Sequence, residues 1–407
     1  MLTIRQEFTV NYAYPVIFTR DAFASGSGPL QELFGSEPAG CRVLTVLDAG
    51  VLECNPGFPE RFRRFAEKVP AAEFLDPVVV RGGESCKNDP GAVEAILALV
   101  EREGLCRHSF VLAIGGGAVL DAAGYAAATA HRGMRLIRMP TTTLAMNDAG
   151  VGVKNAVNAF GRKNFAGCFA PPFAVVNDFD FLRRLPRREQ RCGIAEAVKV
   201  ALVRDGSFFD WLHARRGSLS ACMPQAMESM IIRCAKLHLE HIRNSGDPFE
   251  SGSSRPLDFG HFSAHKLEKI TAGELRHGEA VAVGIALDSL YSQKVGLIGR
   301  HEVGRIFAVL EGVGFRLYHE ALEALDIEQA LQRFREHLGG ELCVPLLDAI
   351  GSRTEVNRID PGLYRRCIDE LAGHDRRMEA DDEQSHFALD RAGNPRTLFS
   401  GEPCPAP

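Results

Sequence analysis

The sequence lacks the features of secreted, membrane-spanning and nucleic-acid-binding proteins. Its 11 cysteines form no CxxC pair, which argues against a disulfide framework and against a cysteine-based zinc site. No apolar run reaches about 18 residues, the length of a membrane span, and the start MLTIRQEFTV has no apolar signal core. The net charge of -5 provides no general basic surface. We therefore expect a cytoplasmic protein with no nucleic-acid or membrane partner, in which a local cluster of Lys and Arg meets any anionic ligand.

What is present is a globular composition, 45% hydrophobic and 24% charged, in a chain of 407 residues that is long enough for two domains. In the first half, apolar runs at 42–51, 76–81 and 109–114 alternate with helical patterns at 57–68, 91–104 and 117–131. Residues 8–19 are typical of a pair of edge strands. Such short strand and helix units predict a parallel sheet with helices on both faces.

The second half has a different pattern, which begins near the basic run RRLPRREQR around Pro186. Helical periodicity predicts helices at 193–215, 218–243, 256–270, 276–295, 299–313, 327–338 and 360–372. The fold class is therefore α/β, with a Rossmann-like N-terminal domain at 1–185 and a mostly helical C-terminal domain at 186–407. Only the tail GEPCPAP is expected to be disordered.

The ends of the predicted strands carry the first candidate site. Glycines 115–117 would let backbone N–H groups approach a pyrophosphate at a helix N-terminus. The spacing is not GxGxxG, so a tight strand-to-helix turn is the competing interpretation. Asp48, Glu84 and Lys87 follow neighbouring strands, where ligands of such sheets bind, and each could contact ribose or adenine.

A metal site is the second candidate. Glu196 lies in GIAEAVK, His261 in DFGHFSAH and His277 in LRHGEAV. Two imidazoles and one carboxylate leave open positions for water or substrate, as in catalytic zinc sites. The three are far apart in the sequence, and each taken alone is more often a helix cap or a satisfied surface group.

The third candidate is a polar pocket within residues 139–199. Lys154 and Lys163 lie among glycines and small residues, and Glu196 and Lys199 share one helix face because they are three apart. A solvated surface is the simpler interpretation for any single cation. Lys154 is the exception, because GVGVKNAVN is an apolar setting in which an unpaired ammonium is costly, so we expect it to face a partner.

Taken together, these segments resemble the sugar phosphate cyclases, the superfamily of 3-dehydroquinate synthase, over roughly residues 10–295. GGGAVLD is similar to the family's NAD pyrophosphate loop and GGESCK to its ribose-contacting turn. MPTTTLAMNDAGVGVKNAVNAFGRKN resembles the core motif, while GIAEAVK, GHFSAH and HGEAV match the three metal-ligand motifs.

The resemblance implies a dehydroquinate synthase-like fold, NAD, zinc or cobalt, a small-molecule sugar phosphate substrate and a homodimer. It assigns the metal to Glu196, His261 and His277. It assigns catalysis to Lys154, Asn164, Lys199 and His265. Substrate contacts fall on Arg132, Asp148, Lys163, Asn164, Glu250, Arg255 and Asp258. Cofactor contacts fall on Asp48, Glu84, Lys87, Gly116, Gly117, Ala118, Asp121, Thr141, Thr142, Asp148, Lys154 and Lys163.

The implied reaction is the conversion of a seven-carbon sugar phosphate to a carbocycle. It comprises transient oxidation of a secondary alcohol, phosphate elimination, return of the hydride, ring opening and an intramolecular aldol closure. Within the central segment, residues 148–164 are expected on the phosphate and nicotinamide side, and Glu196 and Lys199 on the metal side.

Departures from the dehydroquinate synthase pattern concern the substrate. Asp258 replaces an Asn in LDFGH, Ser254 stands where an Arg is expected, with Arg255 adjacent, and Glu240 replaces a Lys on the preceding helix. These favour sedoheptulose 7-phosphate, as in the 2-epi-5-epi-valiolone synthases, and the chain is also similar to cyclases of bacterial Ebo-type gene clusters. His265 is instead the dehydroquinate-type residue.

Three alternatives stay open. A 3-dehydroquinate synthase would act on the heptulosonate 7-phosphate. A polyol dehydrogenase of the glycerol dehydrogenase type shares the fold and the glycine turn. A non-catalytic NAD-binding scaffold is the alternative outside enzymes.

Overall fold

The computed structural model describes residues 1–24, 28–37, 40–250, 255–337 and 340–392, with side chains of the last helix described as far as Met378. Ser254 and the tail GEPCPAP, both singled out above, lie outside the described residues.

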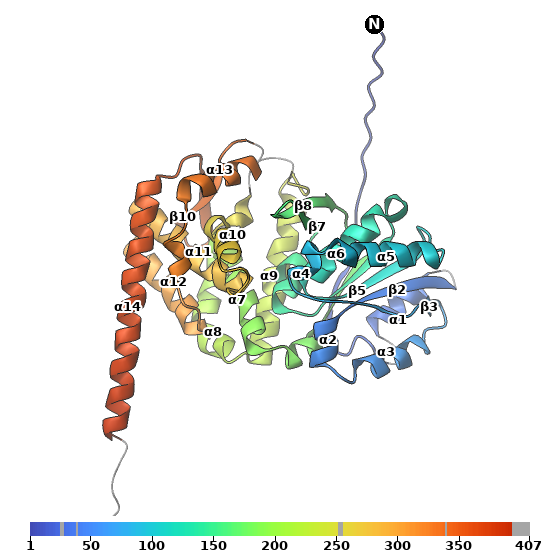
Figure 1. The fold of residues 1–407 in the computed structure, drawn as a ribbon, viewed down its shortest axis with the longest axis horizontal. Coiled ribbons are helices and arrows are strands. Elements are labelled where there is room, and N and C mark those ends of the chain that lie inside the picture. The colour runs from blue at the N-terminus through green and yellow to red at the C-terminus, as the bar shows by residue number, and fades with distance from the viewer. Residues whose placement is uncertain (25–27, 38–39, 251–254, 338–339, 393–407) are drawn as a thin grey trace, which may run out of the picture.

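A seven-stranded parallel sheet forms the centre of the N-terminal half, which confirms the predicted α/β class (Figure 1). Its order is β1-β9-β6-β5-β2-β3, with β4 also paired to β2. The strands are β1 (Val16–Thr19), β2 (Cys41–Asp48), β3 (Ala72–Phe74), β4 (Val78–Val80), β5 (Phe110–Gly115), β6 (Arg135–Pro140) and β9 (Ala174–Asp178). Because every pairing is parallel, the carboxyl ends of all these strands lie along one edge.

Helices cover both faces of this sheet (Figure 1). They are α1 (Pro29–Gly35), α2 (Ala49–Cys54), α3 (Phe58–Ala66), α4 (Ser85–Asn88), α5 (Pro90–Arg102) and α6 (Gly117–Thr129). The period-two alternation of β5 divides the core: Phe110, Leu112 and Ile114 join a phenylalanine-rich cluster with α3. Val111 and Ala113 face the cluster formed with α5 and α6.

The expected pair of edge strands at 8–19 is wrong. Only β1 forms there, parallel to β9, and the N-terminal end of the chain projects from the body (Figure 1). The sequence pattern did not indicate the antiparallel hairpin of β7 (Lys154–Ala159) and β8 (Arg162–Phe169), because its residues are polar or small rather than alternating. The fully buried Arg138 fastens this hairpin, donating to the carbonyl oxygen of Lys154 at 2.7 Å and to the side chain of Asn155 at 2.6 Å.

The C-terminal half is mostly helical, as predicted. Its helices are α7 (Arg187–Arg204), α8 (Gly206–Ser220), α9 (Pro224–Asn244), α10 (His261–Ile270), α11 (His277–Lys294), α12 (Arg300–Val313), α13 (Ile327–His337) and α14 (Pro361–Ala392). The single helix predicted at 193–215 is two, because Asp205 ends α7 and caps α8 by accepting from the N–H of Phe208 at 3.0 Å. A hairpin of β10 (Val344–Ala349) and β11 (Ser352–Val356) was not predicted.

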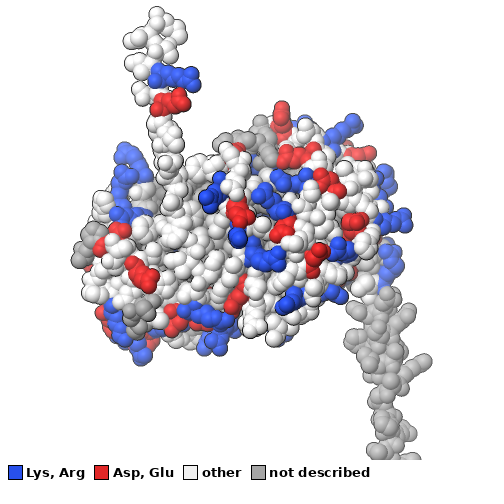
Figure 2. Space-filling view, turned by 180° about the vertical axis from the view of Figure 1, so that it is seen from behind, with Lys and Arg blue, Asp and Glu red and all other residues white. Residues whose placement is uncertain are grey.

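Helices α7 and α11 form the centre of the helical half. Residues 192–203 of α7 are all buried, so its polar members Glu196 and Lys199 are enclosed by protein. The domain division at residues 185 and 186 stays a prediction. Within the described part of the chain the cysteines are free thiols, and no helix has the length and apolar character to cross a membrane. Figure 2 shows basic and acidic side chains interspersed over one face of the body.

Candidate functional site

The three predicted metal ligands converge at one point. Glu196 comes from the middle of α7, and His261 and His277 are the first residues of α10 and α11. Glu196 Oε1 lies 3.2 Å from His277 Nε2 and 3.4 Å from His261 Nε2. A tetrahedral ion with bonds of about 2.0–2.1 Å needs ligand atoms about 3.3 Å apart. The residues therefore fit a zinc-type ion, and all three ligand atoms lie within 4.8 Å of one another.

Two glycines allow this convergence. Gly260, just before His261, has φ +78°, and its N–H donates to Asp288 Oδ2 at 2.8 Å. Gly278 follows His277, and a Cβ there would lie 2.2 Å from the carbonyl oxygen of Cys192 on α7. Larger residues at either position would push the starts of α10 and α11 away from Glu196.

Lys199 neutralises the carboxylate of the site. It lies one turn after Glu196 on α7, contacts that carboxylate, and is buried with it. Burial opposes the charge on both groups. Lys199 and His261 nevertheless hold the pKa of Glu196 well below its usual value, and Glu196 and Asp148 raise the pKa of Lys199.

Glu268 is a functional candidate that the sequence analysis missed. It is largely buried, lies 3.2 Å from His277 Nδ1, and its other oxygen accepts from Lys163 Nζ at 2.8 Å. Burial would lower the pKa of His277, but Glu268 and Glu196 raise it to about 10. The signal was the spacing of His261, His265 and Glu268, which places all three on one face of α10.

Asp148 belongs with Lys199, whereas the sequence analysis placed it on the phosphate side. It lies in the one-turn π-helix η2 (Ala145–Ala149), and its carboxylate is 2.9 Å from His238 Nδ1 on α9. Burial raises the pKa of Asp148, yet His238 and Lys199 lower it to about 2. Glu240, on the same helix, points away from Asp148, and its carboxylate lies 3.9 Å from the Nζ of the exposed Lys236. His238 is thus the residue of this helix that enters the site, because residues two apart face different sides.

The strand edge places the predicted nucleotide residues together. Asp48 ends β2, caps α2 by accepting from the N–H of Gly50 at 2.9 Å, and accepts from the N–H of Gly116 at 3.4 Å. A Cβ on Gly82 would lie 2.3 Å from Asp48 Oδ1, so a larger residue there would displace the Asp48 carboxylate. Helix α6 begins at Gly117 without a side-chain cap, which leaves its first amides available to an anion.

The neighbours of this turn are fixed in part by the β7–β8 hairpin. Lys87 is buried, donates to Asp121 at 2.7 Å and contacts Asn164. Asn158 of the hairpin donates to Glu84 at 2.6 Å. Ala118 lies in the first turn of α6, Thr141 donates its N–H to Gly115 at 3.0 Å, and Thr142 accepts from the N–H of Ala145 at 3.2 Å.

Three of the predicted cations, Lys154, Lys163 and Arg255, have acidic partners nearby. Lys154 Nζ is 2.6 Å from Glu250, which is also 3.2 Å from Arg255. The expected partner of Lys154 is therefore present, but the enclosed setting is not, since 59% of its side chain is exposed. Asp258, in η4 (Pro256–Asp258), lies near enough to help raise the pKa of Lys199.

Two other predicted residues, His265 and Arg132, lie in different parts of the structure. The His265 ring centroid is 5.2 Å from that of His261 and 6.2 Å from that of His277, beside the metal cluster. Arg132 lies in η1 (Ala130–Arg132), beyond the far end of α6. The 13 residues of α6 span about 20 Å. The structure therefore does not bring Arg132 to the other residues within one chain.

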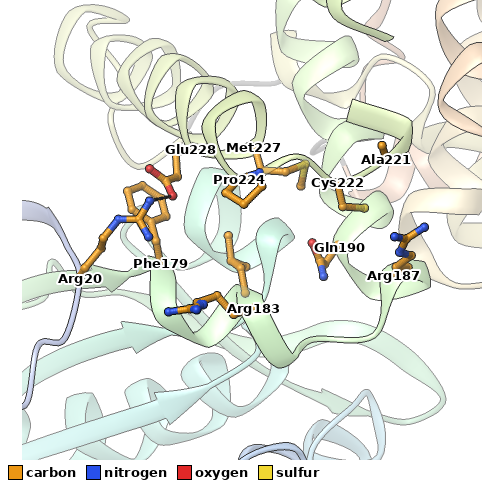
Figure 3. A pocket seen from close by; sticks show the side chains of 11 residues that line it. Arg20, Phe179, Arg183, Arg187, Gln190, Ala221, Cys222, Pro224, Met227 and Glu228 are labelled. Carbon is orange, nitrogen blue, oxygen red and sulfur yellow. Dashed lines mark hydrogen bonds and ion pairs between the residues drawn. The ribbon is translucent and has the colours of Figure 1, made fainter. Parts of the chain in front are cut away.

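A cavity of about 530 Å³ lies apart from these residues. It is formed by η3 (Phe179–Arg184), the start of α7 and the turn between α8 and α9 (Figure 3). Arg183, Arg187 and Cys222 line it, and none of the predicted site residues does. This cavity thus plays no part in the candidate site.

The fold and the site define an α/β protein with an uncapped helix start at its strand edge and a largely buried Glu/His/His cluster on adjoining helices. The N-terminal 3-dehydroquinate synthase family model matches residues 77–192, and the C-terminal one matches residues 193–337. The chain belongs to the 3-dehydroquinate synthase family of sugar phosphate cyclases.

Its relatives include enzymes with different names. A 3-dehydroquinate synthase of Shewanella loihica is 35% identical over 73% of this chain and 82% of its own. A 2-epi-valiolone synthase of Actinosynnema mirum is 33% identical over 75% and 80%. The solved structure of ValA, a 2-epi-5-epi-valiolone synthase from Streptomyces hygroscopicus with NAD+ and Zn2+ bound, matches with a TM-score of 0.83 and 30% identity, over 91% of this chain and 100% of that one.

Proposed function

We propose that this protein is an NAD- and zinc-dependent lyase that converts a seven-carbon ketose phosphate resembling sedoheptulose 7-phosphate to a carbocycle. Phosphate is eliminated and an intramolecular aldol reaction closes the ring. The observation that carries the proposal is the convergence of Glu196, His261 and His277 beside Lys199. ValA, a relative with the same fold, binds the same two cofactors.

The metal is assigned to Glu196, His261 and His277, and cobalt is the alternative to zinc. Bound NAD would supply reversible oxidation of one secondary alcohol, and the bound ion would polarise substrate oxygens and lower their pKa. Glu268 Oε2 lies 3.2 Å from His277 Nδ1, and a proton on Nδ1 shared with this carboxylate would direct Nε2 toward the ion. Lys199 offsets the charge of Glu196 and so prevents that carboxylate from being protonated.

The nucleotide is assigned to the strand edge. The uncapped start of α6 at Gly116, Gly117 and Ala118 would bind pyrophosphate. Asp48 and Glu84 would accept from ribose hydroxyls. The remaining assigned cofactor contacts are Lys87, Asp121, Thr141, Thr142, Asp148, Lys154 and Lys163.

The catalytic assignment uses groups on both sides of the site. Lys154, Lys163 and Asn164 would hold the leaving phosphate, where negative charge accumulates. Because Lys154 is paired with Glu250 and Lys163 with Glu268, a bound phosphate would compete with these two carboxylates. His265, beside the metal cluster and open to solvent, would transfer a proton.

The charge around Glu250 supports the uncharged-headed substrate. Arg255 lies 3.2 Å from Glu250, and Asp258 adds an acid near Lys199. A heptulosonate carboxylate would have to displace Glu250 from Arg255 and approach Asp258, which is unfavourable. We expect higher turnover with the ketose phosphate than with the heptulosonate 7-phosphate; faster conversion of the heptulosonate would reverse the substrate assignment.

Two other enzymatic functions remain as alternatives, each with its own observation. The presence of His265, which is the dehydroquinate-type residue, and the name of the Shewanella relative favour 3-dehydroquinate synthase activity. The parallel sheet with an uncapped α6 also suits a polyol dehydrogenase, which would accumulate NADH. A scaffold without activity would release no phosphate.

A further inference from the structure

The cavity at the start of α7 has no role in the proposed reaction. Its volume of about 530 Å³ is typical of sites that bind small molecules. Four segments that are separate in the sequence form its walls: Arg20 after β1, η3 after β9, the start of α7, and the turn between α8 and α9 with the first turns of α9 (Figure 3). A ligand here would therefore contact elements from both halves of the chain.

Part of the lining is apolar. Phe179, Leu182 and Met227 are buried side chains that border the cavity. Pro224 and Ala221 add apolar surface from the turn between α8 and α9. Such walls favour a ligand with an apolar body, held in place by a few polar groups.

The charged part of the lining is mainly positive. Three arginines, Arg20, Arg183 and Arg187, border the cavity, and Glu228 is the acidic residue among the described residues of the lining, so its net charge is +2. Glu228 forms an ion pair with Arg20 (Figure 3). Arg183 lies 3.7 Å from Asp180, one turn away in η3.

Arg187 differs from the other two arginines. In the described part of the chain, no carboxylate lies within 4.0 Å of its guanidinium group. Burial raises the pKa of the Cys222 thiol, while the nearby charges of Arg191 and Arg187 act to lower it. These two arginines are one helical turn apart on α7, so both add positive charge at the end of the cavity where Cys222 lies.

We propose that this cavity binds a small phosphate monoester, with its phosphate against Arg187 and its apolar body against Leu182 and Met227. A phosphate monoester carries a charge of about −1.5 to −2 at pH 7, which matches the net charge of the lining. A guanidinium group binds phosphate through paired N–H donors. A single carboxylate would balance only half of the positive charge.

This site is separate from the candidate active site. Glu196 lies nine residues after Arg187 on α7, about 14 Å along the helix. None of the residues assigned to NAD, to the metal or to the sugar phosphate borders the cavity. The phosphate monoester is therefore a second small molecule, which can be bound together with the substrate, and the inference does not rest on the proposed reaction.

Cys222 provides a local measure of occupancy, because it borders the cavity. In the full-length protein, iodoacetamide should alkylate Cys222 and the exposed Cys106, and mass spectrometry of the two peptides gives both rates. We expect saturating phenyl phosphate to slow the alkylation of Cys222 about tenfold and to leave Cys106 unchanged. Inorganic phosphate should protect Cys222 only at higher concentration, because it lacks the apolar body, and phenol should not protect it. Unchanged alkylation of Cys222 in phenyl phosphate, or equal protection by phenol, would overturn the proposal.

Two substitutions of opposite sign test the role of charge. Arg187→Ala removes the cation assigned to the phosphate, so the phenyl phosphate concentration that gives half protection should rise about tenfold. Glu228→Gln removes the negative charge from the lining and should lower that concentration about threefold. A general disturbance of the structure would not strengthen binding.

The matched control is Arg184→Ala, which removes an exposed arginine of η3 that does not border the cavity. Its half-protection concentration should stay within about twofold of that of the unchanged protein. An unchanged value in Arg187→Ala, or a raised value in Glu228→Gln, would contradict the proposal. These readouts do not depend on catalysis.

Discussion

The metal side and the phosphate side of the site differ in how their charges are held. Around the metal, Glu196 and Lys199 are buried and the ligand atoms already stand at the separations that an ion needs. On the phosphate side, Lys154 is mostly exposed and forms an ion pair with Glu250, and Lys163 forms one with Glu268. The first region is built by helix packing, whereas the second consists of ion pairs that a substrate must exchange.

This difference assigns different roles to the two regions. Glycines at the starts of α10 and α11 and the buried middle of α7 fix the metal side before any ligand arrives. Ion pairs near the surface contribute little to stability, so Lys154, whose side chain is mostly exposed, can exchange Glu250 for a substrate at small cost. Glu268 joins the two regions, since it contacts both His277 and Lys163.

Removing a metal ligand should have the largest effect. Glu196→Ala leaves Lys199 buried without its counterion and removes one of three ligands, so we expect bound zinc to fall from about one per chain to none and turnover to fall by about 1,000-fold or more. Metal analysis and phosphate release measure the two losses. Glu240→Ala, on an exposed face of α9, is the control and should keep both.

A cation of the phosphate side should affect turnover without affecting the metal. Lys154→Ala removes a charge-assisted contact to the leaving group, and we expect turnover to fall by about 100-fold or more with NAD and zinc still bound. Lys236→Ala is the matched control. Zinc loss in Lys154→Ala would show that the two regions are not separable in this way.

The joining carboxylate should have an intermediate effect on both regions. Glu268→Gln weakens the contact that orients His277, so zinc affinity measured by chelator competition should fall about 10- to 100-fold. The substrate KM should fall at the same time, because Glu268 no longer competes with the substrate phosphate for Lys163. A change in KM alone would mean that Glu268 serves only the phosphate side.

A pH effect on stability is the smallest prediction and concerns the support of the metal side. Burial raises the pKa of Asp288 to about 7 from 3.8, so between these values the folded chain holds a proton that the unfolded chain has lost. Stability from this group therefore falls as pH rises from about 4 to 7, at about 1.4 kcal/mol per pH unit or less.

Asp288→Asn keeps polar contacts to Gly260 and Tyr364 without titrating. Chemical denaturation of both proteins between pH 4 and 7 should show the variant becoming more stable, relative to the unchanged protein, as pH rises. A difference that does not change with pH would contradict a protonated Asp288.

The sequence was sufficient for the parallel sheet, because continuous apolar runs and glycine turns are local signals. It was also sufficient to single out Glu196, His261 and His277 through their motifs, although nothing in their spacing showed that they meet. Glu268 and His238 were missed because their roles depend on which helix face meets which neighbour. Residues 8–19 were misread as a pair of edge strands, because alternation predicts a strand but does not identify the strand's partner.

The central claim is that this site couples transient oxidation to phosphate loss. In the most direct test, the zinc-loaded protein and NAD are incubated with sedoheptulose 7-phosphate in one reaction and with the heptulosonate 7-phosphate in another. Inorganic phosphate and NADH absorbance are followed together in both. We predict about one phosphate released per carbocycle formed, no net NADH, and preference for the ketose phosphate. NADH accumulation without phosphate release would contradict the account.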